Sequence, residues 1–478
     1  MPRHRPSIVL ASLLIASTAP LLAARAAAAP PPAFTVEPLY DVEPTGAPWP
    51  YPACPIPSCP PFSGAFTYQL TPLGGGAAFT AFDFDHGEEV WFTDGTPEGT
   101  GLLADLCPGP CFALPRFLAK LGGELLFVAS ERGGWRLWAT DGLTVRPIGA
   151  VLAQPARPAT GPIDGWIYFV EGSEVWRSDG AVVEPASDFP DGGLFILFQL
   201  FGHGSRAFAS REGLFGTTDE LWEIRPASQR VLRACTDDDE LTDFATLGGA
   251  IYFGASCVEG LPDLGPGLFR TDGSPGGAER VATLDLGSPF HLLPAGDALY
   301  FVESSDETGN TPAAYRVWRS DGTAAGTAPL TGFELPWVRL QPPLGNRYLL
   351  LNGSDHTHTL DLQTGAVLDL PIPSPEGGPI DPSGSFALIG GDTGWWITYG
   401  TPATTFQVFT AASIVPGSSR SAAFLGDRAI FSAEHEVQGE ELWLLGLPGA
   451  LEIPTLGPSG AAILALLLGA VALRALRR

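Results

Sequence analysis

Short runs of alternating apolar and polar residues fill the middle of the chain, and this alternation is typical of β-strands rather than helices. In one recurring phrase a small turn precedes an apolar strand that carries an aromatic residue. The phrase is clearest at Leu121–Phe127, Leu247–Phe253 and Leu425–Phe431, and successive copies end 38 to 49 residues apart. No segment between residues 30 and 447 has a convincing helical period. Weaker copies end at Phe79, Phe169, Phe208, Phe301, Leu350 and Leu388.

A second phrase follows the first, with Trp two positions after its start and Asp-Gly near its end. The front half alone occurs at Glu220–Trp222 and Glu441–Trp443. Trp318 and Trp443 are 125 positions apart, which leaves room for two decayed copies, near positions 360 and 396. The chain therefore contains nine units of about 44 residues. Fuller copies lie at Glu89–Thr96, Arg136–Gly142, Glu174–Gly180, Arg316–Thr323 and, with Phe in place of Trp, Gly267–Gly273.

Each unit reads as strand, hairpin, strand, turn, strand. Asp-Gly pairs supply the positive φ angles that tight turns need. Four-stranded units of this length match propeller blades, which must stack because a single blade cannot cover both of its own faces. We therefore predict an all-β fold with a β-propeller over residues 75–447. Since propellers usually have four to eight blades, the nine units predict seven to nine blades.

The ends of the repeat array predict how the ring closes. The last unit ends after two strands, around Arg428–Ala433 and Glu440–Leu447, and residues 30–74 contain two strand-like pieces, Thr35–Val42 and Phe66–Thr71. Joining these halves completes one blade and removes unpaired sheet edges. We therefore expect all four strands in one sheet.

The repeated phrases, Glu89–Thr96 among them, resemble the ELWxxDGT repeat of exported bacterial proteins. The resemblance covers most of residues 75–447 and implies the same repeat architecture. It brings no assigned chemistry, so the function stays open.

Residues 1–29 have the pattern of a secretory signal, with Arg3 and Arg5 before an apolar stretch and small-residue cleavage sites near Ala24–Ala28. A retained membrane anchor is the alternative. The Ala-rich end followed by three prolines favours cleavage.

The other end carries a second apolar segment. After a linker at residues 448–452, Ile453–Leu473 has no charge and precedes Arg474, Arg477 and Arg478. Such a length can span a bilayer as a helix, and the arginines would stay cytoplasmic. A buried core helix is the alternative, which the absence of helical pattern before this segment disfavours.

This tail also resembles a known signal. Ile453, Pro454, Thr455 and Leu456, followed by the apolar segment and the arginines, resemble the IPTL-type C-terminal sorting signal of Gram-negative bacteria. The resemblance covers residues 453–478. It implies an envelope or surface location and recognition by secretion and sorting machinery at the membrane.

Amino-acid composition limits the classes of partner that the protein can bind. Of 478 residues, 52 are acidic and 26 basic, and Lys120 is the only lysine. A net charge of −26 repels phosphate, which excludes nucleic acid as a partner. The 45% hydrophobic and 10% aromatic content supplies a core and excludes a disordered acidic chain.

Six cysteines fall into local pairs, and in an exported chain an even number favours disulfides. Zinc is the competing interpretation, but no pair has the spacing and partner ligands of a zinc site. We predict three disulfides, Cys54–Cys59, Cys107–Cys111 and Cys235–Cys257.

The densest acid cluster is Asp237, Asp238, Asp239 and Glu240, with Asp243 nearby. Oxygen ligands of this kind suit calcium, although a solvated acidic loop fits the same residues better. Asp83–Gly87 begins like a calcium loop and lacks its bidentate Glu. His356 and His358 share a strand face without a third ligand. The recurrent Asp-Gly-Thr is interpreted as a turn rather than a site.

The histidines lie in unrelated contexts, and the sequence has no phosphate loop or dinucleotide fingerprint. We therefore predict a binding or structural module at the cell surface, for an unknown envelope or extracellular ligand and without a required cofactor. A propeller enzyme acting on polysaccharide at the central channel, as hydrolase or lyase, is the alternative. Carboxylates converging at the channel mouth would favour the enzyme.

Overall fold

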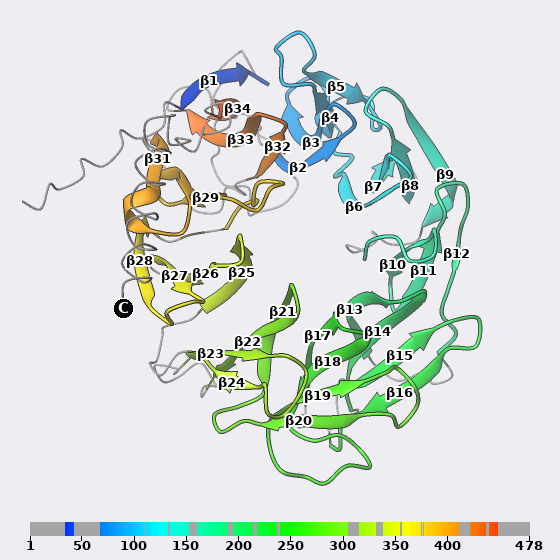
Figure 1. Ribbon diagram of the computed structural model, residues 1–478. Helices are drawn as coiled ribbons and strands as arrows, with labels where there is room; N and C mark the ends of the chain where they lie inside the picture. Colours follow the sequence, from blue (N-terminus) through cyan, green and yellow to red (C-terminus); the bar gives the residue numbers. More distant parts are fainter. Residues whose placement is uncertain are drawn as a thin grey trace, which may run out of the picture. The chain divides into compact units, whose positions relative to one another are not determined.

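Nine antiparallel sheets follow one another along the part of the chain that the computed structural model describes (Figure 1). Each sheet is one blade of a β-propeller, so the predicted all-β class and the nine counted units are confirmed. Seven blades have four strands and two have three. The described residues are 34–42 and 67–447, without positions 110, 132–133, 153–159, 190–194, 214–217, 237–239, 305–314, 331–337, 354–355, 374, 376, 411–420 and 436–438.

Blades 1 to 4 follow chain order. Blade 1 contains β2 (Thr67–Leu73), β3 (Gly76–Asp83), β4 (Gly87–Thr93) and β5 (Gly101–Ala104), and blade 2 contains β6 (Arg116–Leu121), β7 (Glu124–Glu131), β8 (Gly134–Thr140) and β9 (Val145–Leu152). Blade 3 contains β10 (Ile167–Glu171), β11 (Glu174–Ser178) and β12 (Val183–Pro185), and blade 4 contains β13 (Phe195–His203), β14 (Arg206–Gly213), β15 (Glu220–Ile224) and β16 (Gln229–Arg233).

Blades 5 to 8 continue in the same way. Blade 5 contains β17 (Leu241–Leu247), β18 (Ala250–Ala255), β19 (Gly267–Thr271) and β20 (Glu279–Thr283), and blade 6 contains β21 (Pro289–Ala295), β22 (Ala298–Ser304), β23 (Tyr315–Ser320) and β24 (Ala328–Pro329). Blade 7 contains β25 (Val338–Leu344), β26 (Tyr348–Gly353), β27 (His356–Asp361) and β28 (Val367–Pro373), and blade 8 contains β29 (Ala387–Gly391), β30 (Gly394–Thr398) and β31 (Thr405–Thr410).

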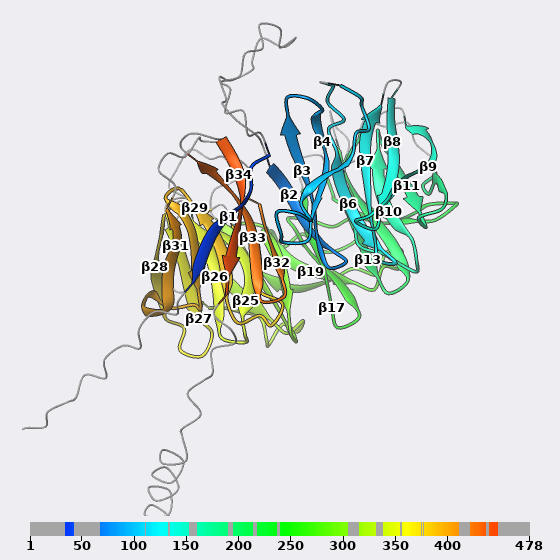
Figure 2. The same cartoon turned by 90° about the horizontal axis from the view of Figure 1, so that it is seen from above.

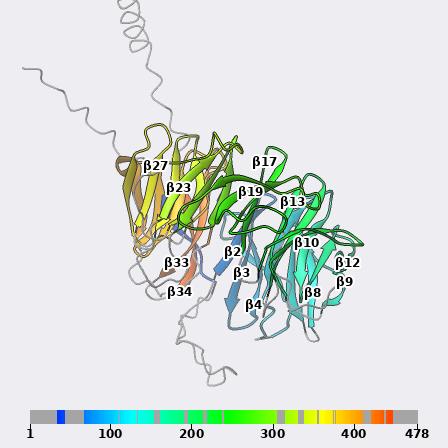
Figure 3. The ribbon, with the colours of Figure 1, turned by 90° about the horizontal axis from the view of Figure 1, so that it is seen from below.

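Blade 9 combines the two ends of the described chain. Its strand order is β32 (Ala422–Leu425), β33 (Arg428–His435), β34 (Gly439–Gly446) and β1 (Thr35–Tyr40). Figures 2 and 3 show β33 and β34 of this blade near β2 of blade 1. Chain segments from opposite ends of the sequence thus lie next to each other.

The first recurring phrase forms the inner hairpin of a blade. In blade 2 the turn residues Gly122 and Gly123 have φ angles of 58° and 94°, which two-residue hairpin turns require and glycine adopts without strain. The aromatic residue then lies in the middle of the following strand, fully buried. The corresponding residue is 0% exposed in every blade: Phe79, Phe127, Phe169, Phe208, Phe253, Phe301, Leu350, Leu388 and Phe431.

The hydrophobic cores lie between blades rather than within them. Each boundary between successive blades has a core to which both blades contribute. At the boundary of blades 9 and 1, Ile430 and Leu442 pack with Ala77 and Phe79. Since that boundary also has a core, the ring of nine blades is closed.

Ring closure is confirmed for the first N-terminal piece and wrong for the second. Strand β1 pairs with β34, with Thr35 opposite Gly446, as expected for Thr35–Val42. Strand β2, predicted as Phe66–Thr71, instead pairs with β3 in blade 1. The last repeat supplies three strands rather than two, because Ala422–Leu425 forms the innermost strand. Only the outermost place in blade 9 was therefore vacant.

A buried carboxylate reinforces the closure. Glu441 on β34 is 3% exposed, and its Oε2 accepts a hydrogen bond of 2.8 Å from the backbone N–H of Val42, just after β1. Glu89 occupies the same place in blade 1, where it accepts from the N–H groups that follow β5. The N-terminal strand thus repeats a bond found within a continuous blade.

The predicted signal, linker and sorting segments lie outside the described residues, as does the expected C-terminal helix. Within the described residues the only helical element is the short 3-10 turn at Pro402–Thr404, and no helix there is long and apolar enough to cross a membrane.

We expect Glu441→Ala to lower the free energy of unfolding by about 1–3 kcal/mol, because it leaves the buried Val42 N–H without its acceptor. Denaturant unfolding of the full chain measures this loss. Glu37→Ala, at an exposed position of β1, is the control and should change stability by less than about 0.5 kcal/mol. Equal losses in the two variants would contradict a specific role for Glu441.

Candidate functional site

The Asp-Gly turns of the second phrase join the last two strands of a blade, and their polar atoms bond to one another. In blade 1, Asp94 Oδ1 accepts from the N–H and hydroxyl of Thr96, at 2.8 and 2.7 Å. The Thr93 hydroxyl accepts from the N–H of Gly95, whose φ is 87°. Hydrogen bonds from Thr96 lower the pKa of Asp94. The turns at Asp141, Asp179, Asp272 and Asp321 repeat the backbone bond to Asp Oδ1.

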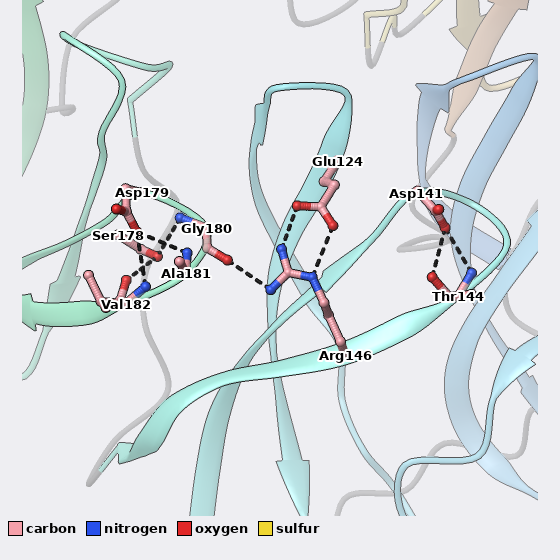
Figure 4. Close-up of polar contacts among 9 residues, drawn as sticks. All are labelled: Glu124, Asp141, Thr144, Arg146, Ser178, Asp179, Gly180, Ala181 and Val182. Carbon is pink, nitrogen blue, oxygen red and sulfur yellow. Dashed lines mark hydrogen bonds and ion pairs between the residues drawn. The ribbon is translucent and has the colours of Figure 1, made fainter.

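Several of these turns are also fastened to the preceding blade by an arginine (Figure 4). Arg146 of blade 2 donates to the carbonyl oxygen of Gly180 in blade 3 at 2.8 Å, while Glu124 of its own blade holds the guanidinium at 2.5 Å. Arg206 and Arg270 make the same type of bond to the next blade, to Gly273 at 2.6 Å and to Gly322 at 2.9 Å. We call this arrangement the arginine latch.

A second set of bonds joins the inner strands near their β-bulges. Gln69, with φ 58°, accepts from the N–H of Phe117 and donates to the carbonyl of Pro115 in blade 2, both at 2.9 Å. Gln199 makes the corresponding pair of bonds with Phe244 in blade 5. These polar side chains therefore connect blades.

One large cavity opens where blades 9, 1 and 2 meet, on the face that carries the turns. It has a volume of about 720 Å³ and is walled mainly by turn residues. We call it the seam pocket. Its lining includes Gly74–Gly76 and Asp94–Gly95 of blade 1, Lys120 and Gly123 of blade 2, and Gly426–Arg428 of blade 9.

The glycines give the seam pocket a wall of backbone. An ideal Cβ atom placed on Gly75, Gly123 or Gly426 would meet no other atom within 4 Å. The charged groups on this wall have opposite signs: Lys120 and Arg428 against Asp94 and Asp427. Amide, carbonyl and charged groups together can bind a polar ligand.

A smaller cavity of about 310 Å³ lies among the inner strands of blades 4, 5 and 6, and we call it the His291 pocket. Four carboxylates line it together with His291 and the buried Arg211. Asp219 accepts from the N–H groups of Gly213 and Leu241, which fixes its carboxylate. The remaining carboxylates are Glu212, Glu240 and Asp243.

His291 and Asp243 are the chemically notable pair in this pocket. The Asp243 carboxylate accepts from the backbone N–H of His291, and both residues have positive φ angles, 30° and 52°. Burial lowers the pKa of His291, so its imidazole is neutral near pH 7 and can accept a proton. Such backbone conformations in non-glycine residues are concentrated at functional sites.

The predicted calcium residues are only partly placed. Glu240 is exposed and lines the His291 pocket, whereas Asp237, Asp238 and Asp239 lie outside the described residues. Among the positions that the structure describes, no three acid, His or Cys side chains are grouped to hold a metal ion.

The other two metal candidates have local partners. His86 and Asp83 form an ion pair of 2.8 Å within the β3–β4 hairpin, and the Asp83 hydrogen bond raises the pKa of His86. His358 bonds to Asp369 at 2.8 Å, and its ring centroid lies 6.3 Å from that of His356.

Two predicted disulfides are confirmed. Cys107–Cys111 and Cys235–Cys257 are bonded, with Cα atoms 5.4 and 5.5 Å apart. Cys54 and Cys59 lie outside the described residues. No free cysteine is found among those described.

Sequence reasoning missed both pockets. The signal for the seam pocket is Arg428, which follows the turn of the first phrase exactly as Arg206 does in blade 4. His291 gave no signal, because it enters the pocket through a bulge in β21. A bulge of this kind has no sequence pattern that marks it.

Comparison with known proteins adds the following. Neither a protein-family model nor a curated protein sequence matches this chain. Similar solved structures include the computationally designed Ika8 protein (TM-score 0.45, 10% identity, 71% of this chain and 98% of that one) and an oligogalacturonate lyase in complex with manganese (0.43, 14%, 81% and 96%). A third is dipeptidyl peptidase 4 of Porphyromonas gingivalis (0.49, 9%, 78% and 64%). None of these similarities assigns an activity to this chain.

Glu89 gives a pH-dependent contribution to stability. Its carboxylate is fully buried and accepts from the N–H groups of Leu106 and Cys107, at 3.0 and 2.9 Å. Burial outweighs these bonds and raises the pKa of Glu89 to about 7. The folded protein therefore holds a proton that the unfolded chain releases near pH 4.5. This stability is complete below pH 4.5 and is lost as the pH rises through 7.

We expect Glu89→Gln to remove this dependence, because the amide does not ionise. Between pH 4.5 and 8 the wild type should lose up to roughly 3 kcal/mol relative to the variant, as measured by denaturant unfolding at each pH. Glu98→Gln, at an exposed turn position, should run parallel to the wild type. A Glu89→Gln curve that also runs parallel would show that Glu89 does not titrate in this range.

Proposed function

We propose that the protein is an exported, envelope-tethered β-propeller that binds a polar ligand in its seam pocket. The observation that carries the proposal is the pocket itself: about 720 Å³, open on the turn face and walled by glycine turns and four charged residues. Ligand pockets typically measure about 300–1,000 Å³ and carry a few placed polar groups.

The polar residues of the repeat support this choice of site. Asp94 and its equivalents bond within their own turns, and the latch arginines bond across blades. The hydrogen bonds of these side chains stabilise the turns and the blade boundaries. Lys120 and Arg428 instead lie on the wall of a cavity.

Export and tethering rest on separate features. Two disulfides suit an oxidising compartment, and residues 1–29 have the pattern of a secretory signal. The IPTL-like tail, Ile453–Arg478, follows β34 closely in sequence, and β34 belongs to the blade that lines the seam pocket. Secretion and sorting machinery would then be its membrane partners.

The His291 pocket favours a second candidate function, a propeller enzyme acting on polysaccharide. A neutral His291 beside four carboxylates has the composition of a general acid–base site. In this reading His291 removes a proton from the substrate and, as the imidazolium, returns it to the leaving group. Saccharide cleavage that His291→Ala abolishes would support this function over simple binding.

Filling the pocket tests the binding function. An ideal Cβ on Gly75 has no neighbour within 4 Å, and Gly75 lines the cavity, so we expect Gly75→Trp to fold normally and to weaken binding of saccharides on a glycan array at least tenfold. Gly161 is equally open and lies outside the pocket lining, which makes Gly161→Trp the matched control. Undiminished binding by Gly75→Trp would place the ligand elsewhere.

Truncation tests the tether. We expect a chain ending at Glu452 to fold, because every described blade ends before that residue, and to appear in the periplasm or medium. The full chain should fractionate with membranes or be found cut near Pro454. Misfolding or aggregation of the truncated protein would show that the tail belongs to the core.

A further inference from the structure

We propose that the seam pocket selects saccharides that carry a carboxylate, and that Arg428 and Lys120 bind this group. The proposal rests on the proposed binding function and deepens it. It starts from a difference between the seam and the other blade boundaries.

At each of the other four Asp-Gly turns the preceding blade supplies an aromatic ring, an arginine bond or both. An ideal Cβ on Gly273 would lie 2.7 Å from the Phe208 ring, and one on Gly322 would lie 2.2 Å from the Tyr252 hydroxyl. The arginine latch closes the same boundaries, through Arg206 and Arg270. These groups occupy the space that stays open beside the Asp94–Gly95 turn.

The boundary of blades 9 and 1 lacks both the aromatic ring and the arginine latch. Arg428 begins β33 as Arg206 begins β14, but in the described structure it forms no hydrogen bond to the Asp94–Gly95 turn. The nearest atom to an ideal Cβ on Gly95 is a methyl carbon of Leu425, at 3.9 Å. The open latch and the missing aromatic ring together leave the seam pocket.

The latch arginine of the seam is therefore available to a ligand. Its ion-pair partner is Asp427, 4.0 Å away, and both side chains are more than half exposed (51% and 84%). Such a pair is weak in water, so a ligand carboxylate can compete with it. A guanidinium binds a carboxylate through two parallel hydrogen bonds.

Lys120 adds a second positive charge. It is exposed and lines the same cavity, and its Nζ makes one long bond, 3.3 Å, to the carbonyl of Pro72. An ammonium group has three donors, so donors remain for a ligand. Asp94 uses Oδ1 within its turn, whereas both cations keep donors for a ligand.

The rest of the wall suits hydroxyl groups. Open glycine turns expose backbone groups that both donate and accept hydrogen bonds. A dianion such as phosphate would meet Asp94, Asp427 and a net charge of −26. One carboxylate on a polyhydroxylated ring matches two cations among donors and acceptors, and it is the ligand class that we assign.

Calorimetry with the full chain tests the assignment. The probes are a glucuronate trisaccharide and its methyl ester, which is the same sugar without charge. We expect the acid to bind at least about tenfold more tightly than the ester, since a charge-assisted contact is lost. Arg428→Gln and Lys120→Gln should each weaken binding of the acid by about tenfold and leave that of the ester unchanged. Arg319→Gln, in an exposed pair with Asp297 outside the pocket lining, is the control.

The possible outcomes distinguish the carboxylate assignment from the proposed binding of a ligand in the seam pocket. Equal binding of acid and ester, both blocked by Gly75→Trp, would overturn the carboxylate assignment and keep the binding function. Tighter binding of a dipeptide or a sugar phosphate at the same pocket would overturn it in the same way. Failure of Gly75→Trp to affect any bound probe would instead reject the seam pocket as the site.

Discussion

A blade of this protein has two apolar faces and no layer of its own to cover either, so each blade depends on both neighbours. Fully buried residues such as Phe127 and Phe301 lie in the second repeat strand, and the cores that contain them belong to pairs of blades. In an open array the first and last blades would each leave one apolar face exposed to water. The closed ring leaves no such face exposed, because blade 9 packs against blade 1 as each earlier blade packs against its successor.

Polar contacts follow the same rule of joining successive blades. The arginine latch fastens a turn to the blade before it, and the glutamines near the bulges bond to the next inner strand. The repeated residues thus form the contacts between blades as well as the strands within each blade. The site arises where the boundary is imperfect: the residues around Arg428 and Gly95 keep the positions of a latch without its bonds.

The repeats made the blades predictable, because Phe79 and its eight equivalents mark one strand in every unit and, in five units, Asp-Gly marks the turn before the last strand. The destination of β2 was mistaken, because the short strand Ala422–Leu425 already held the inner place of blade 9. The pockets could not be read in the same way. The seam pocket joins Lys120 to Arg428 through ring closure, and His291 reaches its pocket through a backbone bulge, so neither depends on neighbouring residues in sequence.

The pairing of β1 with β34 also determines when the ring can close during synthesis and folding. Val42 and Glu441, which bond after closure, are 399 residues apart, so β1 cannot pair until the last strand of the chain has been synthesised. Contacts of such sequence separation form slowly, and until then the outer edge of β34 is an unpaired strand. An unpaired edge can accept the corresponding strand of another chain. Newly synthesised chains are thus open to strand exchange for a limited period, which ends when each chain supplies its own β1.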